Sequence, residues 1–281
     1  FAVSMSLFLA SLNSGSNGNC YYVGNQHEAV LIDAGLSCRE TERRMQRSGL
    51  NMAKVKAVFI THEHSDHTRG VEFISRKYQV PVYFSPQTYS RSRLRLAPDF
   101  LKHFIAYTPV QIGGLSVNAF PKLHDAAEPH SFTVSGNGVT VGVMTDIGSS
   151  CEHVVRNFSI CDAAFLEANY DEEMLEKGRY PIYLKERIRS DYGHLSNHQA
   201  LELFKNHRPL KMSHLLLSHL SQDNNNPHLV EKLFRSHSGG THISIASRHQ
   251  ESPVFRINGG FITNNDQAEP LRQTFVQTKL F

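Results

Sequence analysis

The sequence lacks tryptophan and has few cysteines. Its 281 residues include no Trp, and the cysteines are Cys20, Cys38, Cys151 and Cys161. No two of them form a CxxC pair, which argues against a zinc ribbon and against a redox-active dithiol. We therefore expect free thiols and a cytoplasmic protein, because the cytoplasm keeps thiols reduced.

The sequence also lacks any hydrophobic run of roughly 20 residues, the length that a membrane-spanning helix needs. The apolar stretch from Ala2 to Ala10 is short, and it has neither a basic residue before it nor a small-residue cleavage site after it. We therefore expect no membrane segment and no signal peptide. Because residue 1 is Phe, we interpret residues 1–4 as a remnant of expression and Met5 as the natural start.

A strong charge of either sign is missing as well. Lys plus Arg exceeds Asp plus Glu by 29 − 26 = 3, so net charge does not identify a nucleic-acid-binding protein. Any such function must depend on where the cations lie. A composition of 40% hydrophobic and 20% charged residues excludes a disordered or fibrous protein. A chain of this length can bury a substantial core without a metal or a disulfide.

Short apolar segments alternate with helical signals, which predicts an α/β fold with helices on the outer faces of sheets. The predicted strands are 6–11, 20–23, 29–33, 55–61, 80–84, 115–119, 131–135, 139–145, 163–167, 214–218 and 242–246. The predicted helices are 38–48, 68–78, 86–95, 182–190, 197–206 and 227–236. A turn at Gly136-Asn137-Gly138 predicts a hairpin and therefore a mixed sheet. We expect one domain over 1–257 and a polar extension over 258–281, disordered or derived from a tag.

Histidine is abundant, with 17 residues, and several of them follow a predicted buried strand. The segment His62-Glu63-His64-Ser65-Asp66-His67 brings imidazoles and a carboxylate into six residues. Both groups bind divalent metals, whereas crowding them at a strand end serves no packing purpose. In an extended loop His62 and His64 point the same way, and Asp66 and His67 on the next turn can face a second ion. The motif indicates a metal site rather than a solvated loop.

The order of further motifs resembles the metallo-β-lactamase superfamily, and more closely its bacterial WalJ (YycJ)-type members, which are related to the ribonuclease Z and DNA-repair nuclease branches. The matching segments are 14–19, 31–35, 61–67, 124–126, 145–148, 167–169, 193–196 and 218–221. The resemblance spans about residues 5–257. It implies a four-layer αββα sandwich of two mixed sheets, with helices outside and metals at one rim.

The resemblance implies two divalent metal ions per chain, Zn or Mn. By it, His62, His64 and His124 hold one ion, Asp66, His67 and His219 hold the second, and Asp146 bridges both. Asp33 then supports the ligand loop through hydrogen bonds.

The same resemblance implies a catalytic arrangement around those ions. A hydroxide bridging the metals would attack a phosphodiester, with Asp66 orienting it. His194, oriented by the carboxylate of Glu167, would act as an acid or contact the scissile phosphate. As an alternative, His194 is simply the residue that leads into the helix capped by Ser196.

A basic and aromatic stretch precedes His194. Tyr180, Lys185 and Arg187 are candidate contacts to the phosphates and bases of a nucleic acid, and a solvated amphipathic helix is the alternative interpretation. A second basic set shares one predicted helix at spacings of three and four, and it could form a stripe. This set comprises Arg39, Arg43, Arg44 and Arg47.

These features predict a metal-dependent hydrolase, most specifically a phosphodiesterase that acts as an exonuclease on nucleic acid, with DNA favoured over RNA. A di-metal hydrolase of a small metabolite, either a cyclic phosphodiester or a thioester, is the alternative, and a non-catalytic scaffold that kept its metals is a further one. The sequence has no long insertion resembling the tRNA-gripping arm of ribonuclease Z, which disfavours tRNA processing.

Overall fold

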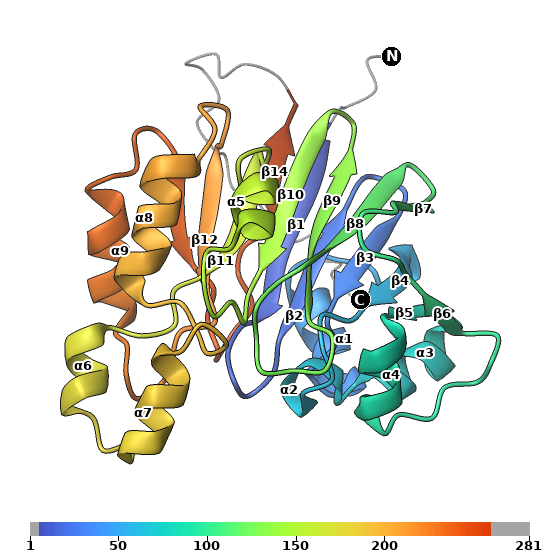
Figure 1. Ribbon diagram of the computed structural model, residues 1–281. Coiled ribbons are helices and arrows are strands. Elements are labelled where there is room, and N and C mark those ends of the chain that lie inside the picture. Colours follow the sequence, from blue (N-terminus) through green and yellow to red (C-terminus); the bar gives the residue numbers. More distant parts are fainter. Residues whose placement is uncertain (1–5, 260–281) are drawn as a thin grey trace, which may run out of the picture.

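The computed structural model describes residues 6–259, which form two facing seven-stranded sheets with helices on the outside (Figure 1). This architecture confirms the predicted αββα sandwich. The proposed remnant 1–4 lies outside the described residues. So does the extension 258–281 beyond residue 259.

The first sheet has the strand order β14-β1-β2-β3-β4-β5-β6. Its strands are β1 (Ser6–Asn13), β2 (Cys20–Gly24), β3 (Ala29–Ile32), β4 (Val55–Phe59), β5 (Val82–Phe84), β6 (Leu101–His103) and β14 (Phe255–Asn258). The pairings from β14 through β3 are antiparallel, and those from β3 to β6 are parallel. The expected domain boundary after residue 257 therefore falls inside the edge strand β14.

The second sheet has the order β13-β12-β11-β10-β9-β8-β7. Its strands are β7 (Val110–Ile112), β8 (Leu115–Pro121), β9 (His130–Gly136), β10 (Val139–Met144), β11 (Ala163–Glu167), β12 (His214–Ser218) and β13 (His242–Ile245). The pairings from β10 to β13 are parallel and the others antiparallel. The predicted hairpin joins β9 to β10, and Asn137 and Gly138 both have positive φ, at 54° and 76°, as a type I′ turn requires.

Helices cover both outer faces and leave an apolar layer between the sheets. Their bounds are α1 (Cys38–Arg47), α2 (Ser65–Thr68), α3 (Val71–Tyr78), α4 (Pro86–Ser92), α5 (Glu152–Phe158), α6 (Glu172–Lys177), α7 (Ile182–Arg189), α8 (Asn197–His207) and α9 (Pro227–Arg235), with a 3₁₀ turn at Met52–Lys54. Met45 of α1 and Ile74 of α3 pack on the first sheet, whereas Phe158 of α5, Phe204 of α8 and Phe234 of α9 pack on the second. Among the described residues no helix is long and apolar enough to span a membrane.

The predicted elements differ from the observed ones mainly where backbone conformation depends on contacts distant in sequence. The helix predicted over 68–78 is broken before Val71, because the Gly70 amide donates to the carbonyl oxygen of Ala34 at 2.7 Å and not to the carbonyl four residues earlier, as a helix requires. The helix predicted to reach 95 ends at Ser92, where Arg93 adopts φ 58°. The edge strands β6, β7 and β14 and the helices α2, α5 and α6 were missed; several are only three or four residues long and offer too little periodicity to detect.

Candidate metal centre

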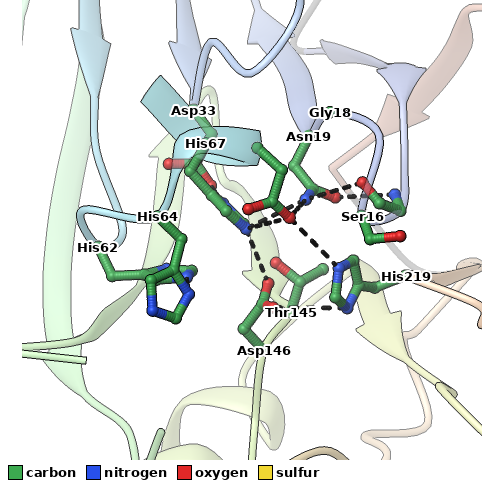
Figure 2. A network of polar contacts seen from close by, with 12 residues as sticks. Ser16, Gly18, Asn19, Asp33, His62, His64, His67, Thr145, Asp146 and His219 are labelled. Carbon is green, nitrogen blue, oxygen red and sulfur yellow. Dashed lines mark hydrogen bonds and ion pairs between the residues drawn. The ribbon is translucent and has the colours of Figure 1, made fainter. Parts of the chain in front are cut away.

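The proposed ligands lie together at one rim of the sandwich, where several strands end. Parallel strands bring their carboxyl ends to the same edge of a sheet, so residues that follow them meet there. Asp33 follows β3, His62 lies beyond β4, Asp146 follows β10 and His219 follows β12. Figure 2 shows the side chains of His67, Asp146 and His219 converging, with His62 and His64 beside them.

Three of these residues take a left-handed backbone conformation that is uncommon outside glycine. The φ angles are 62° at Asp33, 54° at Asp146 and 55° at His219. Asp33 and His219 come directly after a strand, and Asp146 comes two residues after one. The strands predicted through residues 33 and 145 stop earlier, at Ile32 and Met144. Backbone strain of this kind concentrates at functional sites, where it directs side chains away from the sheet.

The first cluster consists of His62, His64 and His124, whose ligand atoms lie within 4.8 Å of one another. His62 Nε2 lies 3.1 Å from His64 Nδ1. The second ring nitrogens of His62 and His124 are occupied, since His62 Nδ1 is 2.9 Å from the Thr61 hydroxyl and His124 Nδ1 donates to the Gly193 carbonyl at 3.1 Å. These bonds leave His62 Nε2 and His124 Nε2 as the nitrogens available, together with His64, to one ion.

The second cluster consists of Asp66, His67 and His219. Asp66 Oδ2 lies 3.5 Å from His67 Nε2 and 4.0 Å from His219 Nε2. Asp146 lies between the clusters, with Oδ2 3.3 Å from His67 Nε2 and Oδ1 3.9 Å from His124 Nε2. A carboxylate in that place can contact two ions, one from each cluster.

Asp33 supports the loop from Thr61 to His67, which carries several of the proposed ligands. Its fully buried carboxylate accepts from His67 Nδ1 at 2.7 Å, from the Thr61 amide at 2.9 Å and from the Thr61 hydroxyl at 2.9 Å. The backbone of Asp66 is held in place as well. The backbone amide of Asn19 donates to the carbonyl oxygen of Asp66 at 2.7 Å, and a Cβ on Gly35 would lie 1.6 Å from that same oxygen. A carboxylate that binds one ring nitrogen of a histidine sets the tautomer and aims the other at a metal.

Glu167 orients two histidines at once. Its Oε1 lies 2.8 Å from His194 Nδ1 and 2.9 Å from His219 Nδ1, while Oε2 accepts from the Ile147 amide at 2.6 Å. Burial would raise the pKa of Glu167, but the positive charge and hydrogen bond of His194 and the hydrogen bond of His219 outweigh it and bring that pKa to about 2. Glu167 is therefore a buried anion at neutral pH.

The side chains at this rim fit divalent ions on three observations. The Nε2 atoms of His124 and His219 are buried and have no hydrogen-bond partner among the described residues. Burial lowers the pKa of His62 and brings that of His124 to about 3, so both rings are neutral and have a free lone pair. Burial also opposes a charge on His67, yet neighbouring carboxylates raise its pKa, which shows that the site favours added positive charge.

Three residues at the site had no role assigned from sequence. The side-chain nitrogen of Asn19, Nδ2, lies 3.3 Å from Asp66 Oδ2 and 3.1 Å from His67 Nε2. Buried Lys122 donates to the carbonyl oxygen of Thr145, the residue before Asp146, at 2.6 Å. Asn169 donates to the carbonyl oxygen of His219 at 2.8 Å. Asn19 and Asn169 lie within the segments that match the family, and Lys122 lies two residues before His124. Their positions in the sequence could therefore have indicated that they belong to the site.

The candidate substrate contacts predicted from the stretch before His194 bind other groups of the protein. Tyr180 donates to Asp223 at 2.8 Å, Lys185 donates to the backbone carbonyl of Glu176, and Arg187 pairs with Asp125 at 2.5 Å.

The second basic set, on α1, is largely engaged as well. Arg43 pairs with Glu40 at 2.8 Å and Arg47 with Glu251 at 2.6 Å, while buried Arg44 binds the Leu12 carbonyl at 2.8 Å. Within the described part of the chain only Arg39 of that set has no polar partner.

Comparison with known proteins gives a consistent result. A family model described as a beta-lactamase superfamily domain matches residues 28–220. The chain is 36% identical over 224 residues to exodeoxyribonuclease YycJ of Bacillus anthracis, covering 79% of this chain and 85% of that protein. It is 31% identical over 219 residues to exodeoxyribonuclease WalJ of Streptococcus pneumoniae, covering 76% and 81%. The solved structure of the metallo-beta-lactamase fold protein YhfI from Bacillus subtilis superposes with a TM-score of 0.69 at 15% identity, covering 89% and 99%, and shows a shared fold.

Proposed function

This chain belongs to the metallo-β-lactamase superfamily of hydrolases, and from that premise we propose that it is a di-metal phosphodiesterase that acts as an exonuclease, with DNA as its favoured substrate. The observation that carries the proposal is the meeting of two ligand clusters, a carboxylate between them and the His194–Glu167 pair at one rim. The likeness to two exodeoxyribonucleases over most of their lengths supports the substrate class.

We assign the first ion to His62, His64 and His124, the second to Asp66, His67 and His219, and the place between them to Asp146. When bound, two such ions would lower the pKa of a water molecule and neutralise charge on a reacting phosphodiester. The mixture of imidazole and carboxylate ligands suits Zn and Mn alike.

The chain's own residues then orient the reactants. Asp66 presents a partly exposed carboxylate that can accept a hydrogen bond from the attacking water. His194 uses Nδ1 to bind Glu167, so Nε2 is the atom that can donate to a phosphate or leaving oxygen. The His194 ring lies 5.3 Å from the rings of both His124 and His219, so it is beside both clusters, and 15% of its side chain is exposed to a substrate.

The reacting end of the polymer would contact side chains around His194. Tyr183 and Tyr192 are 73% and 56% exposed, as rings that stack on bases need to be. Lys185, Arg187 and Tyr180 belong to the proposal as contacts to phosphates and bases, on condition that substrate displaces their present protein partners. We place the protein in the cytoplasm and in DNA repair, and its four free thiols support a reducing compartment.

A digest of end-labelled DNA and RNA, each single- and double-stranded, with Mn²⁺ or Zn²⁺ tests this proposal. We expect mononucleotides released from linear DNA, no cleavage of a circular strand, and no activity in Asp66→Ala protein that is still folded. Retained activity in that variant would show that a contaminant cleaves. If only a cyclic dinucleotide or a thioester is hydrolysed, the small-metabolite alternative holds.

A further inference from the structure

Free cations gather on a different flank of the rim from the one that the sequence suggested. Beside His194, Arg187 is paired with Asp125 and Arg189 with Glu176. On the other flank, the guanidinium groups of Arg39 and Arg76 have no carboxylate or hydrogen-bond partner among the described residues. Figure 1 shows α6 and α7 on one side of that end of the sandwich and α2 and α3 on the other.

These free cations line an open hollow between α1 and α3, here called the α1–α3 groove and defined by Arg39, Glu42, Phe73, Arg76 and Lys77. Its volume is about 690 Å³. Glu42 and Lys77 neutralise each other at 2.6 Å, so Arg39 and Arg76 leave the groove with an excess of positive charge.

Phe73 gives the groove an aromatic surface. Its side chain is 56% exposed although it lies among charged residues. The Arg76 guanidinium lies 5.3 Å from the ring centroid, an arrangement that presents a flat ring beside a cation. Single-stranded nucleic acid is bound by this pairing of cations for phosphates with aromatic rings for bases.

The groove adjoins the metal rim through the chain itself. Helix α2 carries Asp66 and His67, and α3 follows it after Arg69 and Gly70. Arg69 is exposed, and the one hydrogen bond of its guanidinium group among the described residues goes to the carbonyl oxygen of Asn17 at 3.3 Å. Arg76 lies in α3, five residues after its first residue Val71, and is therefore about 8 Å farther along the helix at 1.5 Å per helical residue. Cations are thus spaced outward from the ligands.

We propose that the α1–α3 groove binds the single strand of nucleic acid whose end is cleaved at the metal rim, with Arg39 and Arg76 on phosphates and Phe73 stacked on a base. This inference rests on the proposed function. It assigns the strand to the flank where no internal ion pair has to be broken before a phosphate can bind, because displacing a paired carboxylate would cost part of the binding energy.

The test measures binding of fluorescein-labelled 20-nucleotide single strands, DNA and RNA in separate arms, by anisotropy. Full-length protein carrying Asp66→Ala prevents digestion. Into it we would introduce Arg39→Ala with Arg76→Ala, or Phe73→Ala. The matched control is Lys205→Ala with Arg235→Ala, which removes the same charge from exposed positions on α8 and α9. Thermal unfolding checks that each variant is folded.

The double groove variant should bind about tenfold more weakly, and its slope of log affinity against log salt should be smaller by about 1.4, because each phosphate contact on a single strand contributes about 0.7. Phe73→Ala should weaken binding at least about fivefold, and Phe73→Tyr should restore it. The control should match the parent protein. Equal affinities and slopes in the groove variant and the control would overturn the inference.

A second measurement separates this inference from the proposed function. With Asp66 intact, the groove variants should hydrolyse bis(p-nitrophenyl) phosphate, which is too small to reach the groove, as fast as the wild type does. They should degrade the 20-nucleotide strand more slowly at limiting concentration. If the wild type hydrolyses the small diester but neither binds nor degrades DNA or RNA, the nuclease proposal itself fails. If it degrades nucleic acid and the groove variants do so equally well, only the groove assignment fails.

Discussion

His194 and His219 share one acceptor: the Nδ1 atoms of both rings lie within 2.9 Å of Glu167 Oε1. One buried carboxylate therefore orients a proposed metal ligand and the proposed acid at the same time. Because Glu167 also accepts from two backbone amides, its four donors need both acceptor oxygens of an ionised carboxylate.

Glu167→Gln should impair catalysis with little effect on substrate binding. An amide has one acceptor oxygen, so its NH2 group must face either the two histidines or the backbone amides of Ile147 and Leu195, and one of these two pairs of donors loses its acceptor. We expect kcat to fall by about 10² with KM little changed. Steady-state kinetics on a labelled strand would measure this, with exposed Glu202→Gln on α8 as the control. Activity within twofold of wild type would refute the orienting role.

Asp33→Asn should weaken metal binding. The Asp33 carboxylate accepts from His67 Nδ1, and loss of such a partner typically lowers metal affinity about 10–100-fold. Competition with a chromophoric chelator would measure the affinity. Asp162→Asn is the matched control, because Asp162 is also buried but binds Thr140 and Lys211 instead. Equal losses in the two variants would mean that the effect is only structural.

Metal removal should destabilise the protein, since the unpaired Nε2 atoms of His124 and His219 and the carboxylates around them favour a cation. Elemental analysis should find close to two transition-metal ions per chain. Metal at about 100 times its dissociation constant should stabilise the metal-free protein by about 2.7 kcal/mol in denaturant unfolding. His124→Ala should reduce the metal content, and exposed His228→Ala should not. Protein without metal after metal-replete purification would contradict the assignment of the site.

Stability should also fall as the pH drops from about 7 to about 4, through a histidine far from the rim. His214 begins β12, and burial followed by the charge of His242 lowers its pKa from 6.5 to about 4. Between those values the unfolded chain binds the proton and the folded one does not. Lowering the pH therefore favours unfolding, by up to about 3 kcal/mol.

His214→Phe should remove much of that dependence, since the ring packs 5.3 Å from His242 and 5.4 Å from Phe255. Urea unfolding at pH 7 and at pH 5 would measure the difference in free energy of unfolding. His237→Phe, at an exposed site after α9, serves as the control. An unchanged pH dependence in His214→Phe would exclude this origin.

The local sequence pattern was enough to predict most of the fold and the residues that make up the site. The apolar runs that became β4, β10 and β12 are buried on both faces and end in polar residues, so the sequence shows where each strand stops and a chemical group begins. The histidine and aspartate spacing from His62 to His67 is likewise short-range, and these residues do meet at the rim.

By itself, then, the sequence determined the layered α/β fold and which side chains gather at the strand ends, because strand periodicity and ligand spacing are properties of neighbouring residues. Only the tertiary structure decided which nitrogen of the His124 and His219 rings is free, since the hydrogen bonds that His124 donates to Gly193 and His219 donates to Glu167 join distant segments. It also decided which cations are available to a substrate. Arg187 and Arg39 look alike in sequence, yet only Arg187 is brought against a carboxylate, and packing between separate elements makes that difference.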